Sequence, residues 1–275
     1  MGSSLQDKYS YLQEIETRYT AQELQSWTNG HIRLPIYGTI AFLLMISILP
    51  RIMRSYKPMD LRSLLFFWNM GLAIFSLFAS IRMIEQVRSE MSSGLTSSSV
   101  RKNICSLGTD NVSSLWMYLY TMSKFIQFGD TFFLIVRKKR LTFLHLWHHG
   151  VVLGFMWLQF SSGAPALKYF MLMNVIIHAM MYFYYAVQCL GIQVHKSIAM
   201  SITAIQIIQM VIGLLTQYMS YHYLVSGYTC FRNDWAAASA LIVYGSCLYL
   251  FSTFFVDKYL TSPVDMNQNV RAKAQ

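Results

Sequence analysis

Long runs without Asp, Glu, Lys or Arg constrain the fold of this chain more than any other sequence feature. A helix needs about 20 mostly apolar residues to cross the core of a bilayer. The apolar residues here are continuous rather than alternating as in barrel strands. We therefore predict an all-α integral membrane protein with seven transmembrane helices. The expected spans are residues 34–50, 63–81, 112–136, 141–167, 169–195, 197–231 and 235–256.

The composition excludes several other classes of protein. Charged residues make up 12% of the chain, whereas soluble globular domains carry about 25%. With 55% hydrophobic residues as well, the chain is not expected to be a soluble enzyme, a disordered chain or a disulfide-rich secreted domain. The net charge of +10 does not predict a nucleic-acid partner, because such a site needs clustered Lys and Arg on a soluble scaffold.

The distribution of basic residues predicts the orientation, because cytosolic loops carry an excess of Lys and Arg. The strongest signal is the block Arg137, Lys138, Lys139 and Arg140 between two expected spans. We expect a luminal N-terminal segment (1–33), a seven-span domain (34–257) and a cytosolic tail (258–275). The tail carries Arg271 and Lys273, which resemble a di-basic endoplasmic-reticulum retrieval signal, although a plain basic tail would look the same.

Two of the four cysteines fall in loops on the expected luminal face. An oxidising lumen permits disulfides. We therefore predict a bridge between Cys105 and Cys230.

Polar side chains inside the expected spans are functional candidates, because a charge at mid-membrane costs roughly 2.5–3.5 kcal/mol. The third span carries Lys124, Gln127 and Thr131 on one helical stripe, with Asp130 beside it. The alternative interpretation is a buried Lys124–Asp130 pair with a structural role.

The fourth span carries His145, His148 and His149, which helical spacing places on one side. A lone buried histidine is usually structural, but three together indicate chemistry. Imidazole either ligates a metal or does acid–base and nucleophilic work near neutral pH.

The fifth and sixth spans carry further polar stripes. We interpret the fifth as the lining of a polar cavity. The amides of the sixth can instead hold helices together. If all four groups face the same interior, they converge on one enclosed site. The residues are Asn174, His178, Met181, Tyr182, Tyr184 and Tyr185 in the fifth span, and Thr203, Gln206 and Gln209 in the sixth.

In order and spacing, these motifs resemble the fatty acid elongase family, the condensing enzymes of very-long-chain fatty acid synthesis. The resemblance rests on an HxxHH box at 145–149, a KxxxxxDT segment at 124–131, an NxxxHxxMYxYY segment at 174–185 and a TxxQxxQ segment at 203–209. It covers about residues 34–260. One departure is Gln127, where the family usually has Glu.

The resemblance implies a fold and an activity. Six of seven helices would surround a narrow tunnel closed towards the lumen of the endoplasmic reticulum. The enzyme would join malonyl-CoA to a long-chain acyl-CoA, release CoA and CO2, and give a 3-ketoacyl-CoA two carbons longer. No tightly bound cofactor is implied. The implied partners are membrane lipid and the ketoacyl-CoA reductase, hydroxyacyl-CoA dehydratase and enoyl-CoA reductase of the same cycle, with a homodimer also open.

The resemblance also assigns roles within the site. His148 would carry the acyl chain as an acyl-imidazole, and Lys124 and Asp130 would tune the histidines or hold geometry. Hydrogen-bonding and proton-transfer roles would fall to His145, His149, His178 and Asn174. Substrate contacts would fall to Gln127, Thr131, Met181, Tyr182, Tyr184, Tyr185, Gln206, Gln209 and the block 137–140, whose other interpretation is topogenic.

Two alternatives stay open from the sequence. A membrane di-iron desaturase or hydroxylase also uses HxxHH boxes, but it needs several of them and this chain has seven His with one cluster. A single metal could still be held by His145, His149 and His178. The polar residues at 124 and 130 would suit the ligand or ion path of a seven-span receptor or transporter. The histidines suit such a protein less well.

Overall fold

The computed structural model describes residues 10–11, 13–90, 97–105, 110–231 and 233–261, and these residues form helices and connecting loops without strands. The order is α2 (Ala21–Gly30), α3 (Arg33–Met53), α4 (Arg62–Glu90), α5 (Ser97–Cys105), α6 (Asn111–Ile126), α7 (Phe128–Val136), α8 (Phe143–Ser161), α9 (Leu167–Cys189), α10 (Lys196–Val225), α11 (Asp234–Phe255) and the π-helical turn η1 (Val256–Leu260). The expected tail signal at Arg271 and Lys273 lies outside the described residues.

Five helices in the described residues are long and apolar enough to cross a membrane: α3, α4, α9, α10, and α11 continued by η1. The chain is therefore a helical, multi-pass membrane protein. The other two predicted spans do not meet this measure. The third is broken at Gln127 into α6, with 16 residues, and α7, with 9 residues. The fourth corresponds to α8, whose 19 residues include the three histidines.

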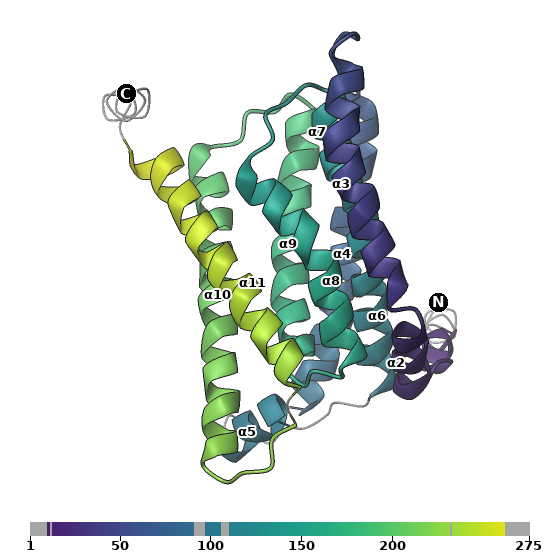
Figure 1. Ribbon diagram of the computed structural model, residues 1–275, viewed down its shortest axis with the longest axis vertical. Coiled ribbons are helices and arrows are strands. Elements are labelled where there is room, and N and C mark those ends of the chain that lie inside the picture. The colour runs from purple at the N-terminus through teal and green to yellow at the C-terminus, as the bar shows by residue number, and fades with distance from the viewer. Residues whose placement is uncertain (1–9, 12, 91–96, 106–109, 232, 262–275) are drawn as a thin grey trace, which may run out of the picture.

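The long helices run side by side along the molecule (Figure 1). α4 packs along α9 and α10 packs along α11, while α8 contacts α2, α3, α6 and α11 and so lies at the centre. One end of the bundle contains α7 and the C-terminal ends of α3 and α11, and we call it the basic end. The opposite end contains α2 and α5 (Figure 1).

The sixth span is shorter than the expected run of 197–231. α10 ends at Val225, and the loop to α11 begins at Ser226. Gly227 follows with a φ of 82°, a conformation that glycine adopts without a steric cost. The loop is joined to α5 by a disulfide between Cys105 and Cys230, and the Phe231 amide donates to the Cys105 carbonyl at 2.9 Å.

Below the centre of the bundle the interior is filled with apolar side chains. Phe155 of α8 and Phe170 of α9 each meet the ring of Tyr244 of α11 edge to face. Gly213 of α10 makes room for that ring, since a Cβ there would lie 3.1 Å from it. This cluster packs α8, α9, α10 and α11 together.

Candidate functional site

A cavity of about 770 Å³ lies between the central helices towards the basic end. Many of the predicted residues contribute to its wall, from α7, α8, α9 and α10. They are Gln127, Asp130, Arg137, His145, His148, His149, Asn174, His178, Met181, Tyr182, Tyr184, Tyr185, Thr203, Gln206 and Gln209. Members of all four polar groups therefore line one cavity.

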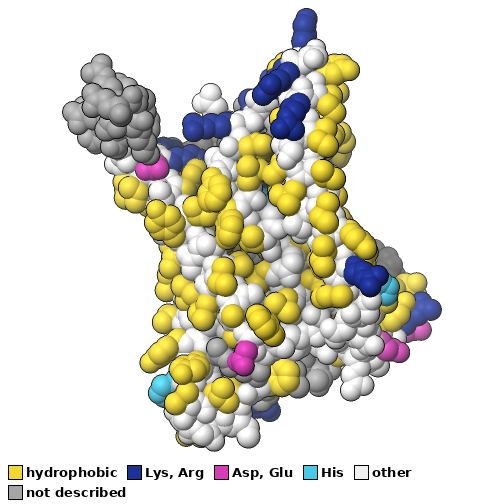
Figure 2. Space-filling model, in the orientation of Figure 1, with side chains coloured by type: hydrophobic (Ala, Val, Ile, Leu, Met, Phe, Trp, Pro, Cys, Tyr) yellow, Lys and Arg dark blue, Asp and Glu magenta, His cyan; other side chains and the backbone are white. Residues whose placement is uncertain are grey.

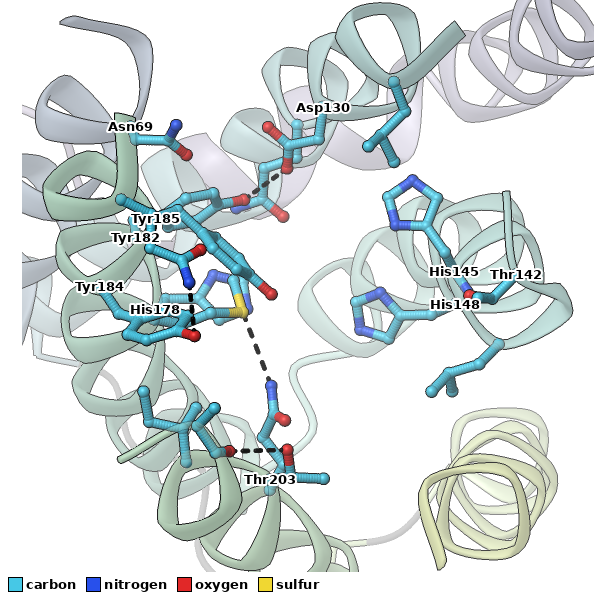
Figure 3. Close-up of a pocket in the computed structure, with 18 of the residues that line it drawn as sticks. Asn69, Asp130, Thr142, His145, His148, His178, Tyr182, Tyr184, Tyr185 and Thr203 are labelled. Carbon is cyan, nitrogen blue, oxygen red and sulfur yellow. Dashed lines mark hydrogen bonds between the residues drawn. The ribbon is translucent and has the colours of Figure 1, made fainter. Parts of the chain in front are cut away.

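The histidine box occupies the first turns of α8. Thr142 caps this helix by accepting from the His145 amide at 3.2 Å, which fixes where the helix begins. His145 and His148 project across the cavity towards α9 (Figure 3). His149 is buried against them, with its ring centroid 4.2 Å from that of His145 and 5.3 Å from that of His148.

The facing wall is α9, which carries the fifth-span stripe. Tyr120 donates its hydroxyl to Asn174 Oδ1 at 2.7 Å, so the amide orientation is fixed. His178 is buried and meets the ring of Tyr182 edge to face. The labelled histidine and tyrosines of α9 face the histidines of α8 across the cavity (Figure 3). Imidazoles from two helices therefore line one cavity.

Several polar atoms around this cavity are buried without a hydrogen-bond partner. They include Nδ1 of His149, Nδ1 of His178 and Oε1 of Gln209. Buried polar atoms in folded proteins are nearly always paired, and exceptions call for an explanation such as a ligand. Thr203, by contrast, donates to the Ala199 carbonyl of its own helix.

Lys124 lies behind the wall rather than in it. It is 1% exposed, its Nζ lies 3.3 Å from Gln127 Oε1, and it sits 3.9 Å from the centre of the Tyr120 ring. The ion pairs found in the described part of the chain do not include one between Lys124 and Asp130. The two residues therefore do not form a direct ion pair, and their interpretation as a buried structural pair stays a prediction.

Asp130 is instead held by neutral donors from two other helices. Trp68 Nε1 of α4 donates to Oδ1 at 2.8 Å, and the Tyr182 hydroxyl of α9 donates to Oδ2 at 2.7 Å. The next residue, Thr131, is fully buried, and its Oγ1 lies 2.8 Å from His145 Nε2. Trp68 was missed from the sequence, because an indole in an apolar run leaves no polar pattern.

The basic block contributes to the cavity through one residue only. Arg137 is in the lining, whereas Lys138, Lys139 and Arg140 are exposed outside it. Two basic residues that the sequence analysis did not single out are also in the lining: Arg62 at the start of α4 and Lys258 in η1. Lys and Arg side chains gather at this end of the surface, and apolar side chains cover much of the flank below (Figure 2).

A second buried polar region was also missed. Near the end of the bundle that contains α2 and α5, Arg82 pairs with Glu16 and Glu85, and Lys168 pairs with Glu90. Arg82 and Lys168 are both only 5% exposed. Within the described residues, His, Cys, Asp and Glu side chains are not grouped as a metal site.

Comparison with known proteins gives a consistent match. Residues 27–266 match the GNS1/SUR4 family, ELO. The chain is 31% identical to very long chain fatty acid elongase 6 of Homo sapiens over 252 residues, which cover 90% of this chain and 92% of the human protein. It is 30% identical to the elongase 6 of Gallus gallus with the same two coverages. It is 28% identical to very long chain fatty acid elongase 4 of Trypanosoma cruzi over 96% of this chain and 93% of that protein.

Proposed function

Because this chain belongs to the GNS1/SUR4 (ELO) family of fatty acid elongases and so is a condensing enzyme of fatty acid elongation, we propose that condensation takes place in the cavity between α8 and α9. Malonyl-CoA and a long-chain acyl-CoA would give a 3-ketoacyl-CoA two carbons longer, with release of CoA and CO2. The observation that carries this proposal is that the HxxHH imidazoles and His178 line one cavity, where buried ring nitrogens of His149 and His178 lack partners.

We assign the nucleophile to His148, which lines the cavity and is partly buried. A ring nitrogen of the neutral imidazole attacks the acyl thioester, the C–S bond breaks, and CoA leaves as a thiolate that takes up a proton. Malonyl-CoA then loses CO2 to give an enolate, whose carbon attacks the acyl group and frees His148. A covalent intermediate divides one difficult step into two easier ones.

The surrounding polar groups would stabilise charge and move protons. Asn174 has its oxygen bonded to Tyr120, which leaves its amide N–H groups as donors towards a developing oxyanion. His149 and His178 each retain an unpartnered ring nitrogen for a substrate group or a transferred proton. Gln206 and Gln209 line the opposite side from α10.

We propose that the CoA phosphates bind at the mouth of the cavity. Arg62, Arg137 and Lys258 come from three different elements and all line the cavity. Guanidinium and ammonium groups form strong charge-assisted hydrogen bonds with phosphate oxygens. The exposed residues Lys138, Lys139 and Arg140 would then attract the polyanionic substrates at longer range or fix the orientation of the protein in the membrane.

The same reasoning extends to membrane placement. We propose that α6 with α7 forms one further span and α8 another, giving seven, with six of them around the substrate tunnel. In the membrane of the endoplasmic reticulum, the C-terminus would face the cytosol and the 1–33 segment would face the lumen. This orientation is supported by the basic end, and by the disulfide of Cys105 and Cys230 near α5 at the opposite end, where an oxidising lumen suits it.

The working partners follow from the reaction. The product is a 3-ketoacyl-CoA, so a ketoacyl-CoA reductase, a hydroxyacyl-CoA dehydratase and an enoyl-CoA reductase would complete the cycle in the same membrane. A homodimer is compatible with the lipid-facing apolar surfaces. The substrates supply the reactive thioester and the carboxylate, so we propose no tightly bound cofactor.

The test is extension of acyl-CoA by the purified protein. Labelled malonyl-CoA is incubated with acyl-CoAs of graded chain length, and the products are resolved by mass. The proposal predicts 3-ketoacyl-CoA two carbons longer with at least one substrate. No product across the whole series would overturn it.

A further inference from the structure

We propose that Trp68, which lies outside the cavity wall, is a positioning residue that holds His145 in its working orientation through the first turn of α7. This inference rests on the proposed function of the same site. Trp68 is on α4, whereas His145 is on α8, and contacts of Gly129, Asp130 and Thr131 of α7 connect the two side chains.

The connection begins at a close contact between an indole and a helix backbone. A Cβ at Gly129 would lie 2.4 Å from Cζ2 of Trp68 and 2.6 Å from Cη2, so only glycine fits. The ring therefore lies directly on the first turn of α7. This close approach brings Trp68 Nε1 to 2.8 Å from Asp130 Oδ1.

The carboxylate of Asp130 then fixes α7 from two sides. Its second oxygen accepts from the Tyr182 hydroxyl of α9 at 2.7 Å. Hydrogen bonds to a charged group are stronger than neutral ones, so this bridge between α4 and α9 defines the rotation of α7 about its axis.

The rotation of α7 matters because the helix is separate from its neighbour. The chain breaks at Gln127, and α7 has only 9 residues. Short helices derive most of their stability from tertiary contacts. The turn that Trp68 fixes also carries Thr131, whose Oγ1 contacts His145 Nε2 at 2.8 Å. A rotated α7 would release this imidazole.

Trp68 also has an ordinary packing role, which the experiment must separate from positioning. Its ring meets Phe133 edge to face at 5.3 Å and packs against the cluster of Leu72, Ala73 and Tyr182. Benzothienylalanine at position 68 separates the two roles, because sulfur replaces the indole N–H while the ring keeps nearly the same shape. The matched control is the same replacement at Trp235, which is 79% exposed.

We expect benzothienylalanine at 68 to lower kcat about tenfold or more, since it removes a donor to a carboxylate. KM for both substrates should stay within about twofold, because the substrate contacts are kept. Tm should fall modestly, because one hydrogen bond to a buried carboxylate is lost while the packing is kept, so kcat is compared per folded molecule. Thr131→Val should show the same split, and Thr131→Ser should restore kcat. The two changes should be strongly non-additive, because they act through one connection.

A spectroscopic readout makes the result independent of elongase activity. With ring-labelled histidine, the NMR signal of His145, assigned from a His145→Gln sample, should shift on replacement at 68 and not at 235. If wild-type protein elongates nothing, the proposed function fails, and the His145 signal alone decides this inference. Unchanged kcat with an unchanged His145 signal would overturn it, as would a lower Tm with full kcat per folded molecule.

Discussion

Two buried polar regions lie towards opposite ends of the bundle, and they differ in whether their polar atoms have partners. One is the cavity with the histidines, which we call the chamber. The other we call the charge cluster, defined as Glu16, Arg82, Glu85, Glu90 and Lys168.

The charge cluster is internally satisfied. Glu16 receives the Arg82 guanidinium and also the indole N–H of Trp116 at 2.8 Å. Glu90 receives Lys168 at 2.6 Å and the Tyr169 hydroxyl at 3.1 Å. Such a cluster ties the N-terminal segment, α4, α6 and α9 together and leaves little for a ligand to bind.

The chamber is left incomplete. Two imidazole nitrogens and an amide oxygen have no partner beside the cavity. The other unpartnered atoms found in the described residues belong to Asp110 and Ser113 at the start of α6, away from this lining. The contrast teaches that burial alone does not identify a functional polar group. What identifies it is burial without a partner beside open volume.

The largest expected effect tests the chamber. His148→Ala should lower condensation at least about 10³-fold, because it removes the proposed nucleophile. Its side chain takes part in none of the hydrogen bonds found in the described residues and lines the cavity, so thermal unfolding in detergent should be unchanged. Loss of both folding and activity in this variant would mean that His148 has a structural role. It would also contradict the distinction between the chamber and the charge cluster.

The next effect tests the charge cluster. Arg82→Met should destabilise the protein by about 3–5 kcal/mol, because it leaves the buried carboxylate of Glu16 without its cation. Activity per folded molecule should be kept. Denaturant unfolding of this variant beside Arg88→Met, which changes an exposed arginine of the same helix, gives the measurement and its control. Equal stability of the two variants would refute a stabilising role.

A smaller effect is expected at the disulfide. Cys105→Ser should cost about 2–4 kcal/mol, because the unfolded chain regains the freedom that the bridge removed. Thiol labelling and gel mobility with and without reductant report the bridge itself. Reductant should lower the Tm of the wild-type protein to that of the variant. Identical mobility and labelling in both conditions would count against the bridge.

The smallest expected effect compares two amides. Gln209→Met should change stability by less than about 0.5 kcal/mol, since an apolar group replaces an unpartnered oxygen. Gln159→Met should destabilise by about 1–3 kcal/mol, because Gln159 donates to the Ala236 carbonyl at 2.7 Å. Turnover should fall only in the first variant. The reverse pattern in the two unfolding curves would contradict the distinction.

Much of the fold can be predicted from the sequence, because each membrane span is a continuous apolar stretch of neighbouring residues. Five of the expected charge-free runs correspond to helices that meet the spanning measure. The run at 112–136 differs, because α6 ends at Ile126 and α7 begins at Phe128, beside Gly129, whose missing Cβ leaves room for the Trp68 ring. Helical spacing also grouped the histidines correctly, since i, i+3 and i+4 positions share a face.

The sequence alone does not predict which residues far apart along the chain form ion pairs or hydrogen bonds with one another. Arg82 pairs with Glu16 across 66 positions, and Trp68 reaches Asp130 across 62. The pattern of charges along the chain therefore did not indicate the partner of Arg82, nor the two donors that hold Asp130. Likewise, only the turn after α7 decides that Arg137 lines the cavity while Lys138 is exposed.

The chamber's central claim is that His148 carries the acyl group, and one measurement tests it most directly. The purified protein is incubated with acyl-CoA in the absence of malonyl-CoA, and intact mass and peptide mapping locate any adduct. The account predicts one acyl group on His148 that disappears when malonyl-CoA is added and is absent from His148→Ala. An adduct that persists in His148→Ala, or that maps to another residue, would contradict it.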